Sequence, residues 1–140
     1  MLFRLGRIKG GGPVGPGLFF VIPCMDDITV MDLRTLTVDI PPQEIMTKDT
    51  VTVCVDAVVY YKVVDPLMAV NNVANVDQST KLLASTTLRT ILGSKSLAQL
   101  LADRVPIAEE LMVLLDKGTD PWGIKVRHHC IAIVRIFISL

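Results

Sequence analysis

A long alternation of apolar and mixed side chains between Val51 and Val63 is the strongest structural signal in this chain of 140 residues. Successive side chains of a β-strand point to opposite faces, so an alternating pattern predicts a strand with one buried face. β-branched and aromatic residues dominate the segment, as such a surface favours. The face expected to enter the core consists of Val51, Val53, Val55, Ala57, Val59, Tyr61 and Val63.

Shorter elements are expected on both sides of this strand. The same alternation predicts strands at 28–30 and 36–40. Pro41-Pro42 is expected to end the second one, because proline cannot donate to a sheet ladder. Asp65 is placed to cap a helix, with Pro66 at the first helical position, where its missing N–H is no loss.

Three helices and a final strand are predicted after this cap. The first helix is expected to end at Gly93, and the third near Gly118. Ser96-Leu97-Ala98-Gln99 matches the capping box that opens the second, short helix. The side chains expected to point inward are Ala84, Leu88, Ile91 and Leu92, then Leu97, Leu100 and Leu101, and finally Ile107, Leu111 and Leu114. Residues 124–138 have strand composition, and this order of elements predicts an α+β fold.

The segment from Lys9 to Gly17 is rich in glycine and proline and predicts a loop. Residues 10–15 formally match the G-x-G-x-x-G pattern of dinucleotide-binding loops. Pro13 and Pro16, however, remove backbone N–H donors, and the residues that follow, 18–21, are expected to form a strand instead of a helix. No nucleotide is therefore expected as a ligand.

An apolar run follows this loop and ends at Pro23-Cys24. No apolar segment reaches the roughly 18 residues of a membrane-spanning helix, so membrane attachment is expected from this surface, from lipidation or from residues outside this sequence. The candidate membrane-facing residues are Leu18, Phe19, Phe20, Val21 and Ile22. Cys24 beside them is a candidate for S-palmitoylation, and the alternative is a buried free cysteine; the residues alone leave both open.

Composition excludes several kinds of partner. Lys and Arg together number 14, as do Asp and Glu, so the chain lacks the basic field with which proteins bind nucleic acid. Three widely spaced cysteines argue against a disulfide framework and favour a reducing, cytosolic compartment. The first residues do not match a secretory signal.

The residues contain no recognisable catalytic or metal-binding constellation. His128, His129 and Cys130 are adjacent, so on a strand they cannot all face one metal ion. No nucleophile motif surrounds any serine or cysteine. The carboxylate pairs Asp26-Asp27 and Glu109-Glu110 are expected to be solvated. We therefore expect no catalysis, no metal and no cofactor.

Several motifs, in order along the chain, resemble those of the stomatins, a branch of the band 7 family (SPFH, prohibitin-homology). They are Phe3-Arg4-Leu5-Gly6-Arg7, Gly15-Pro16-Gly17-Leu18-Phe19-Phe20-Val21-Ile22-Pro23-Cys24, Asp32-Leu33-Arg34-Thr35, Ile40-Pro41-Pro42-Gln43-Glu44, Thr47-Lys48-Asp49, Val55-Asp56-Ala57-Val58-Val59-Tyr60-Tyr61, Thr86-Thr87-Leu88-Arg89 and Trp122-Gly123-Ile124-Lys125-Val126. The series is far more specific than any one of its members.

This resemblance implies an SPFH domain in a protein on the cytoplasmic face of the plasma membrane. Stomatins are non-catalytic scaffolds that self-associate into large oligomers, favour cholesterol-rich membrane and modulate ion channels or transporters. They are palmitoylated near their membrane-facing end, and Cys24 falls at a matching position. Residues 1–140 are expected to form a single domain, without the family's upstream membrane hairpin and downstream coiled coil.

Three other interpretations stay open. The chain could be a prohibitin-like regulator of a membrane protease, or a truncated, non-functional product. It could also be a small enzyme that depends on Cys24, Cys54 or His129.

Overall fold

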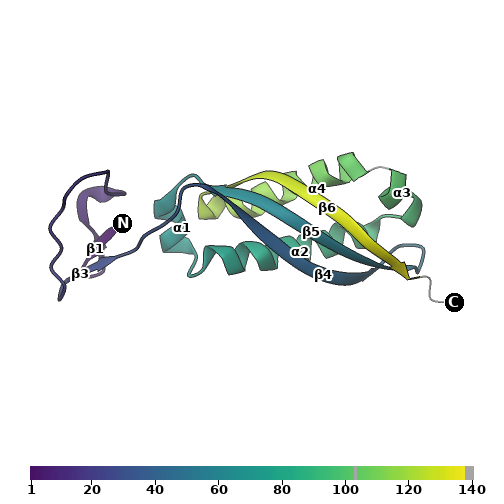
Figure 1. Ribbon diagram of the computed structural model, residues 1–140, viewed down its shortest axis with the longest axis horizontal. Helices are drawn as coiled ribbons and strands as arrows, with labels where there is room; N and C mark the ends of the chain where they lie inside the picture. The colour runs from purple at the N-terminus through teal and green to yellow at the C-terminus, as the bar shows by residue number, and fades with distance from the viewer. Residues whose placement is uncertain (103, 138–140) are drawn as a thin grey trace.

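The computed structural model describes residues 1–102 and 104–137 (Figure 1). These residues form two antiparallel sheets of three strands each. The smaller, N-terminal sheet has the order β2-β1-β3, with β1 at Leu2–Arg4, β2 at Arg7–Ile8 and β3 at Asp26–Ile28. The larger sheet has the order β4-β5-β6, with β4 at Thr35–Met46, β5 at Thr52–Val63 and β6 at Ile124–Phe137.

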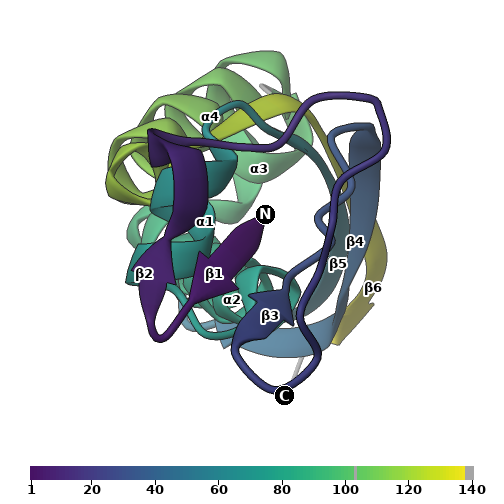
Figure 2. The ribbon, with the colours of Figure 1, turned by 90° about the vertical axis from the view of Figure 1, so that its left-hand side faces the viewer.

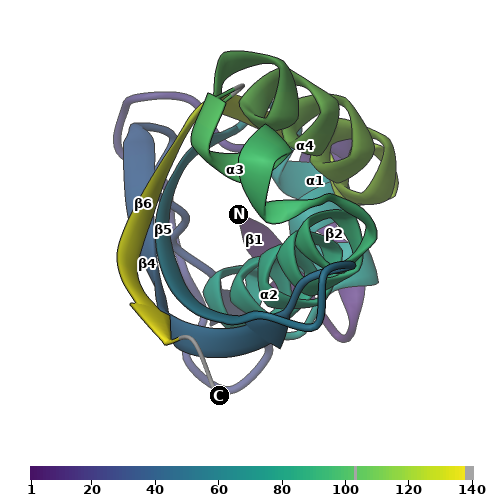
Figure 3. The ribbon, with the colours of Figure 1, turned by 90° about the vertical axis from the view of Figure 1, so that its right-hand side faces the viewer.

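The helices lie between β5 and β6 in the chain. They are α1 (Pro66–Asn72), α2 (Val76–Ser94), α3 (Leu97–Ala102) and α4 (Arg104–Thr119), and 3-10 turns occur at η1 (Lys9–Gly11) and η2 (Asp120–Trp122). α2 and α4 cover one face of the larger sheet, and none of the described helices covers the other (Figure 1, Figure 3). The N-terminal sheet lies beyond the end of the larger sheet where β5 ends and β6 begins (Figure 1). This arrangement confirms the predicted α+β class.

β5 is the central strand of the larger sheet, and its predicted register is confirmed. The odd-numbered side chains from Val53 to Val63 are buried, and Val55, Val59 and Tyr61 are completely so. The even-numbered side chains are half-buried or exposed on the face without helices. Leu88 of α2 and Leu111 of α4 are also fully buried in this core. The larger sheet therefore has an inner face toward the helices and an outer face toward solvent.

β4 continues through Pro41 and Pro42, contrary to the expectation that they would end it. It pairs with β5 on both sides of the prolines, and its register shifts between Ile40 and Gln43. β4 is an edge strand, so one side of its backbone needs no ladder bonds. The bulge takes the two residues without N–H groups out of the ladder. The strand expected at 28–30 is found two residues earlier, at Asp26–Ile28.

Both predicted helix caps are confirmed. The Asp65 carboxylate accepts from the backbone N–H of Leu67 at 2.9 Å, with Pro66 in the first helical turn. At the start of α3, the N–H of Gln99 donates to Ser96 Oγ at 3.4 Å, and the N–H of Ser96 donates back to Gln99 Oε1 at 3.1 Å. Each cap satisfies backbone donors that a helix terminus leaves without partners.

Four expected details of the helices are wrong. The single helix expected between the Asp65 cap and Gly93 is divided into α1 and α2. Gly93 lies inside α2, which continues to Ser94 in helical geometry. Leu101 and Leu114 are 46% and 44% exposed instead of pointing inward. The buried positions of α4 include Ile107, Leu111 and Leu115, four residues apart. Leu114 and Leu115 are both apolar, so only the placement of α4 against the sheet decides which of them enters the core.

Candidate functional site

A half-buried ion pair closes the base of the long loop between β2 and β3. Arg4 on β1 lies opposite Asp26 on β3. The Nε and Nη2 atoms of Arg4 donate to the two carboxylate oxygens of Asp26 at 2.7 and 2.9 Å. The backbone N–H of Ile22 donates to the same carboxylate at 3.0 Å. A bidentate, charge-assisted contact therefore holds the end of the loop against the N-terminal sheet.

Asp26 is only 7% exposed, so the expectation of a solvated Asp26-Asp27 pair is wrong for its first member. The hydrogen bonds from Arg4, followed by the one from Ile22, hold the pKa of the Asp26 carboxyl well below its ordinary range. Sequence reasoning missed the contact because its partners are far apart in the chain. No local pattern connects them.

Asp26→Asn is expected to loosen the N-terminal sheet at neutral pH without unfolding the larger one. Because the native pKa of Asp26 is lowered, its stabilising effect is present above the ordinary aspartate pKa of about 4 and is lost as the pH falls through the native value. Amide hydrogen exchange should become faster at Ile22 and at Leu5, whose N–H donates to Met25 O at 3.1 Å, and stay unchanged in β5. The difference from the parent should shrink in acid. Equal exchange at neutral pH would contradict a role for this contact.

The tip of the loop presents bulky apolar side chains to solvent. Leu18 is fully exposed, at 107% of its reference area, and Phe20 is 95% exposed. Phe19 is 47% exposed and turns toward a hollow of about 240 Å³ that the N-terminal sheet also lines. Val21 is half-buried and Ile22 is 43% exposed. The five candidate residues therefore separate into an outward pair, Leu18 and Phe20, and three side chains that partly contact the protein.

Residues 18–21 do not form the strand expected for them. The next strand, β3, begins only at Asp26, and among the described residues no strand pairs with 18–21. Their backbone groups make no backbone hydrogen bond within the described residues, and the nearest turn lies just beyond them, where the N–H of Met25 donates to Ile22 O at 3.0 Å. A short apolar run forms a strand only where a neighbouring strand is available to pair with it.

Exposed apolar side chains are concentrated in this part of the chain. Of the 19 large hydrophobic side chains that are exposed in the described residues, 10 lie within residues 1–34. They are Leu5, Val14, Leu18, Phe19, Phe20, Ile22, Met25, Ile28, Val30 and Leu33. An apolar surface of this extent on one end of a domain is typical of a membrane or protein contact.

Cys24 follows the apolar run directly and is exposed. The structure thus argues against the alternative of a buried thiol, and acylation stays a prediction. Cys54 is half-buried on the outer face of β5. The side chains of His128, His129 and Cys130 lie outside those that the structure describes.

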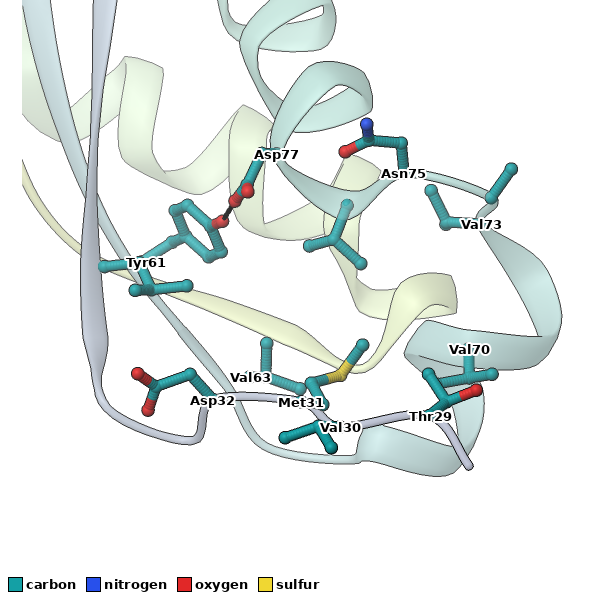
Figure 4. A pocket seen from close by; sticks show the side chains of 13 residues that line it. Thr29, Val30, Met31, Asp32, Tyr61, Val63, Val70, Val73, Asn75 and Asp77 are labelled. Carbon is teal, nitrogen blue, oxygen red and sulfur yellow. Dashed lines mark hydrogen bonds between the residues drawn. The ribbon is translucent and has the colours of Figure 1, made fainter. Parts of the chain in front are cut away.

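A pocket of about 550 Å³ opens where the linker after β3 passes the start of α2 (Figure 4). Its apolar wall includes Val30, Met31, Val63, Val70 and Val73. At one side of it the Tyr61 hydroxyl donates to the Asp77 carboxylate, which joins β5 to the first turn of α2 (Figure 4).

Burial, together with this hydrogen bond, raises the pKa of Tyr61 well above its ordinary range. The hydroxyl therefore stays protonated at physiological pH, and its chemistry is that of a structural hydrogen bond. The sequence held a signal for this contact: alternation placed Tyr61 on the buried face, where a hydroxyl needs a partner.

Among residues 1–102 and 104–137, no helix has the length and apolar character that crossing a bilayer requires. Among the side chains that the structure describes, which do not include those of residues 128–137, no three from His, Cys, Asp or Glu gather closely enough to hold a metal ion. The glycine-rich segment forms η1 and a loop, and no helix opens at its third glycine.

Comparison with known proteins agrees with the motifs. The SPFH domain / Band 7 family matches residues 1–136. The chain is 52% identical to "Stomatin" of Mus musculus and 51% identical to "Stomatin-like protein 3" of Homo sapiens, in both cases over all of its 140 residues. It is 49% identical to "Mechanosensory protein 2" of Caenorhabditis elegans over the same length.

The chain therefore belongs to the SPFH domain / Band 7 family, and its similarity is to stomatin and stomatin-like proteins. It spans 49%, 48% and 29% of the lengths of these three relatives. What the whole relatives do is thus a guide to this chain and not a description of it.

Proposed function

We propose that this chain is the SPFH domain of a non-catalytic, stomatin-type scaffold that contacts the cytoplasmic face of the plasma membrane through its N-terminal loop. Leu18 and Phe20 enter the interfacial region of the bilayer, and Cys24 carries an acyl chain beside them. The scaffold self-associates, favours cholesterol-rich membrane and modulates ion channels or transporters.

The observation that carries this proposal is the anchored loop with an apolar tip. Leaving Leu18 and Phe20 in water costs free energy, since burial of one such side chain is worth about 1.5–3 kcal/mol. The Arg4–Asp26 contact holds the base of the loop in place. This restraint reduces the conformational entropy that the loop loses when its tip enters a membrane. Exposed apolar side chains on a loop with an anchored base can bind a lipid surface, whereas they supply no group that could take part in catalysis.

Family membership supports the remaining parts of the proposal. Two of the relatives described above are a stomatin and a stomatin-like protein, and each matches the full length of this chain. Self-association and the modulation of channels or transporters come to this chain from that family. The proposed preference for cholesterol-rich membrane is also inferred from membership of that family.

The double substitution Leu18→Asp/Phe20→Asp is expected to weaken binding to neutral phosphatidylcholine vesicles by about a hundredfold or more, because it replaces the two side chains that enter the lipid with charges. Vesicle flotation measures this binding. Leu82→Asp is the control, because Leu82 is 69% exposed on α2, far along the chain from the loop. Equal losses in both variants would contradict the proposal.

Expression in animal cells tests whether Cys24 carries an acyl chain. One acyl chain gives only marginal membrane affinity, so Cys24→Ser should move the protein toward the cytosolic fraction while the loop retains part of the binding. An acyl-exchange assay should label the parent at Cys24 and not the Ser variant. If the parent were not labelled, Cys24 would have no part in attachment.

A further inference from the structure

Two lysines lie directly opposite each other on neighbouring strands of the larger sheet. Lys62 of β5 pairs with Lys125 of β6, and Arg127 follows two residues later on β6. Ile124 and Val126 are buried, whereas Lys125 and Arg127 are exposed, and Lys62 is half-buried on the outer side of β5. Like charges at opposed positions of adjacent strands destabilise a sheet, so this arrangement needs an explanation.

None of these three cations forms an ion pair within 4.0 Å in the part of the chain that the structure describes, where the ion pairs are Arg4–Asp26 and Lys95–Glu110. The nearest carboxylate to Lys125 and Arg127 is that of Asp116 on α4, and it accepts the backbone N–H of Val126, the residue between them, at 2.9 Å. Asp65, the next carboxylate after Lys62, is occupied by N–H groups of α1.

The other carboxylates of the outer face are further away. Thr35 of β4 lies opposite Lys62, and Asp39 lies four residues along the same strand. At about 3.3 Å per residue this separates Asp39 from the cations by about 13 Å, more than the screening length of about 8 Å at physiological salt. Glu44 and Asp56 lie further still along the sheet. The outer face therefore has a basic end and an acidic remainder.

The basic end lies beside the apolar loop. β5 ends and β6 begins at the end of the larger sheet that is nearest to the N-terminal sheet (Figure 1). Figure 2 shows β2 in front of α1, while the long loop after β2 crosses to the side of the larger sheet. The cations and the loop that carries Leu18 and Phe20 thus share one end and one side of the molecule.

We propose that Lys62, Lys125 and Arg127 bind the headgroups of anionic lipids when the loop enters the bilayer. This inference rests on the proposed membrane contact and adds the class of lipid. The cytoplasmic leaflet contains anionic lipids that attract basic residues near its surface. Each such cation raises the affinity for the membrane by about fivefold. A phosphate or carboxylate between the two lysines relieves their repulsion, and the carboxylates of Asp39, Glu44 and Asp56 keep the opposite end of the face away from the membrane.

Flotation with two kinds of vesicle tests this proposal. One kind contains phosphatidylcholine alone, and the other contains added phosphatidylserine. The parent should bind the anionic vesicles about a hundredfold more tightly, and Lys62→Gln/Lys125→Gln/Arg127→Gln should lose most of this preference while binding neutral vesicles as the parent does. The matched control Lys81→Gln/Arg89→Gln/Lys117→Gln removes three exposed cations from α2 and α4 and should keep it.

The possible results separate this inference from the proposed function. Binding to neutral vesicles with no anionic preference would overturn the inference and leave the membrane contact standing. Failure to bind any vesicle would overturn both. Equal losses in the two triple variants would show a net-charge effect and overturn the inference. Binding of poly-glutamate that depends on Lys62, Lys125 and Arg127, without lipid preference, would assign these residues to an acidic protein partner instead.

Thermal unfolding supplies a separate readout. Removal of the opposed charges relieves repulsion, so the Lys62→Gln/Lys125→Gln/Arg127→Gln variant should melt no lower than the parent. A clearly lower melting temperature would mean that these side chains serve the fold, and would overturn the inference.

Discussion

Val55→Asp is expected to leave the domain largely unfolded at physiological temperature. Val55 is completely buried on β5, between β4 and β6 and beneath the helices. A carboxylate at this position would have no partner, and such a group costs several kcal/mol. That is a large part of the 5–15 kcal/mol that typically stabilises a domain. Thermal unfolding followed by circular dichroism measures the effect.

Thr52→Asp is the matched control for this prediction. Thr52 lies on the same strand with its side chain on the outer face, where it is half-buried. The change in charge is the same, but the new carboxylate can reach water, so a loss of less than about 1 kcal/mol is expected. If Thr52→Asp unfolded the domain and Val55→Asp melted like the parent, the inner and outer faces of β5 would have been exchanged.

Gly123→Ala is expected to lower stability by about 2–4 kcal/mol, from left-handed backbone strain and overpacking together. Gly123 has a φ of 67°. A Cβ atom there would lie 2.6 Å from the carbonyl oxygen of Asp65, closer than any real contact. The carbonyl of Gly123 also accepts the N–H groups of Val64 and Asp65, at 2.9 and 3.0 Å. The Trp122-Gly123-Ile124 motif therefore contains glycine because the turn before β6 passes directly against Asp65, the cap of α1.

Gly15→Ala is the control for this glycine. No atom lies within 4 Å of a Cβ atom built on Gly15, and its φ lies outside the left-handed region. Its replacement should leave the melting temperature unchanged or slightly higher, because alanine reduces the freedom of the unfolded chain. Gly123→Ala should lower it by about 5–15 °C in the same assay. Equal melting temperatures for the two variants would refute the proposed close approach at Gly123.

Most rules that act over a few residues were reliable in this chain, and the expected helix stop at Gly93 is an exception. The buried face of β5, the Asp65 cap and the Ser96–Gln99 capping box are each specified within one strand or one helical turn. The period of the strand and the unpaired donors of a helix terminus depend on the local backbone alone. The order of strands and helices predicted the α+β fold, and the family motifs predicted the SPFH assignment that the comparison supports.

Errors arose where the answer depended on a distant part of the chain. Pro41-Pro42 end a central strand but not an edge strand, and the sequence does not state that β4 is at the edge. Residues 18–21 have the composition of a strand, yet no described strand lies beside them. Leu114 has the same apolarity as Leu115, and the packing of α4 on the sheet selects the second.

Some features of the candidate site could likewise be predicted from the sequence, and others depended on the tertiary structure. The sequence by itself determined that an apolar run between glycines and prolines would end at Cys24, because composition and turn chemistry are local properties. Only the tertiary structure decided that Leu18 and Phe20 point outward while Phe19 turns back, that Arg4 reaches Asp26, and that Lys62 lies opposite Lys125. Each of these depends on the pairing of segments far apart in the chain. Such pairing follows from the sum of many weak burial and hydrogen-bond energies, which no short stretch of sequence contains.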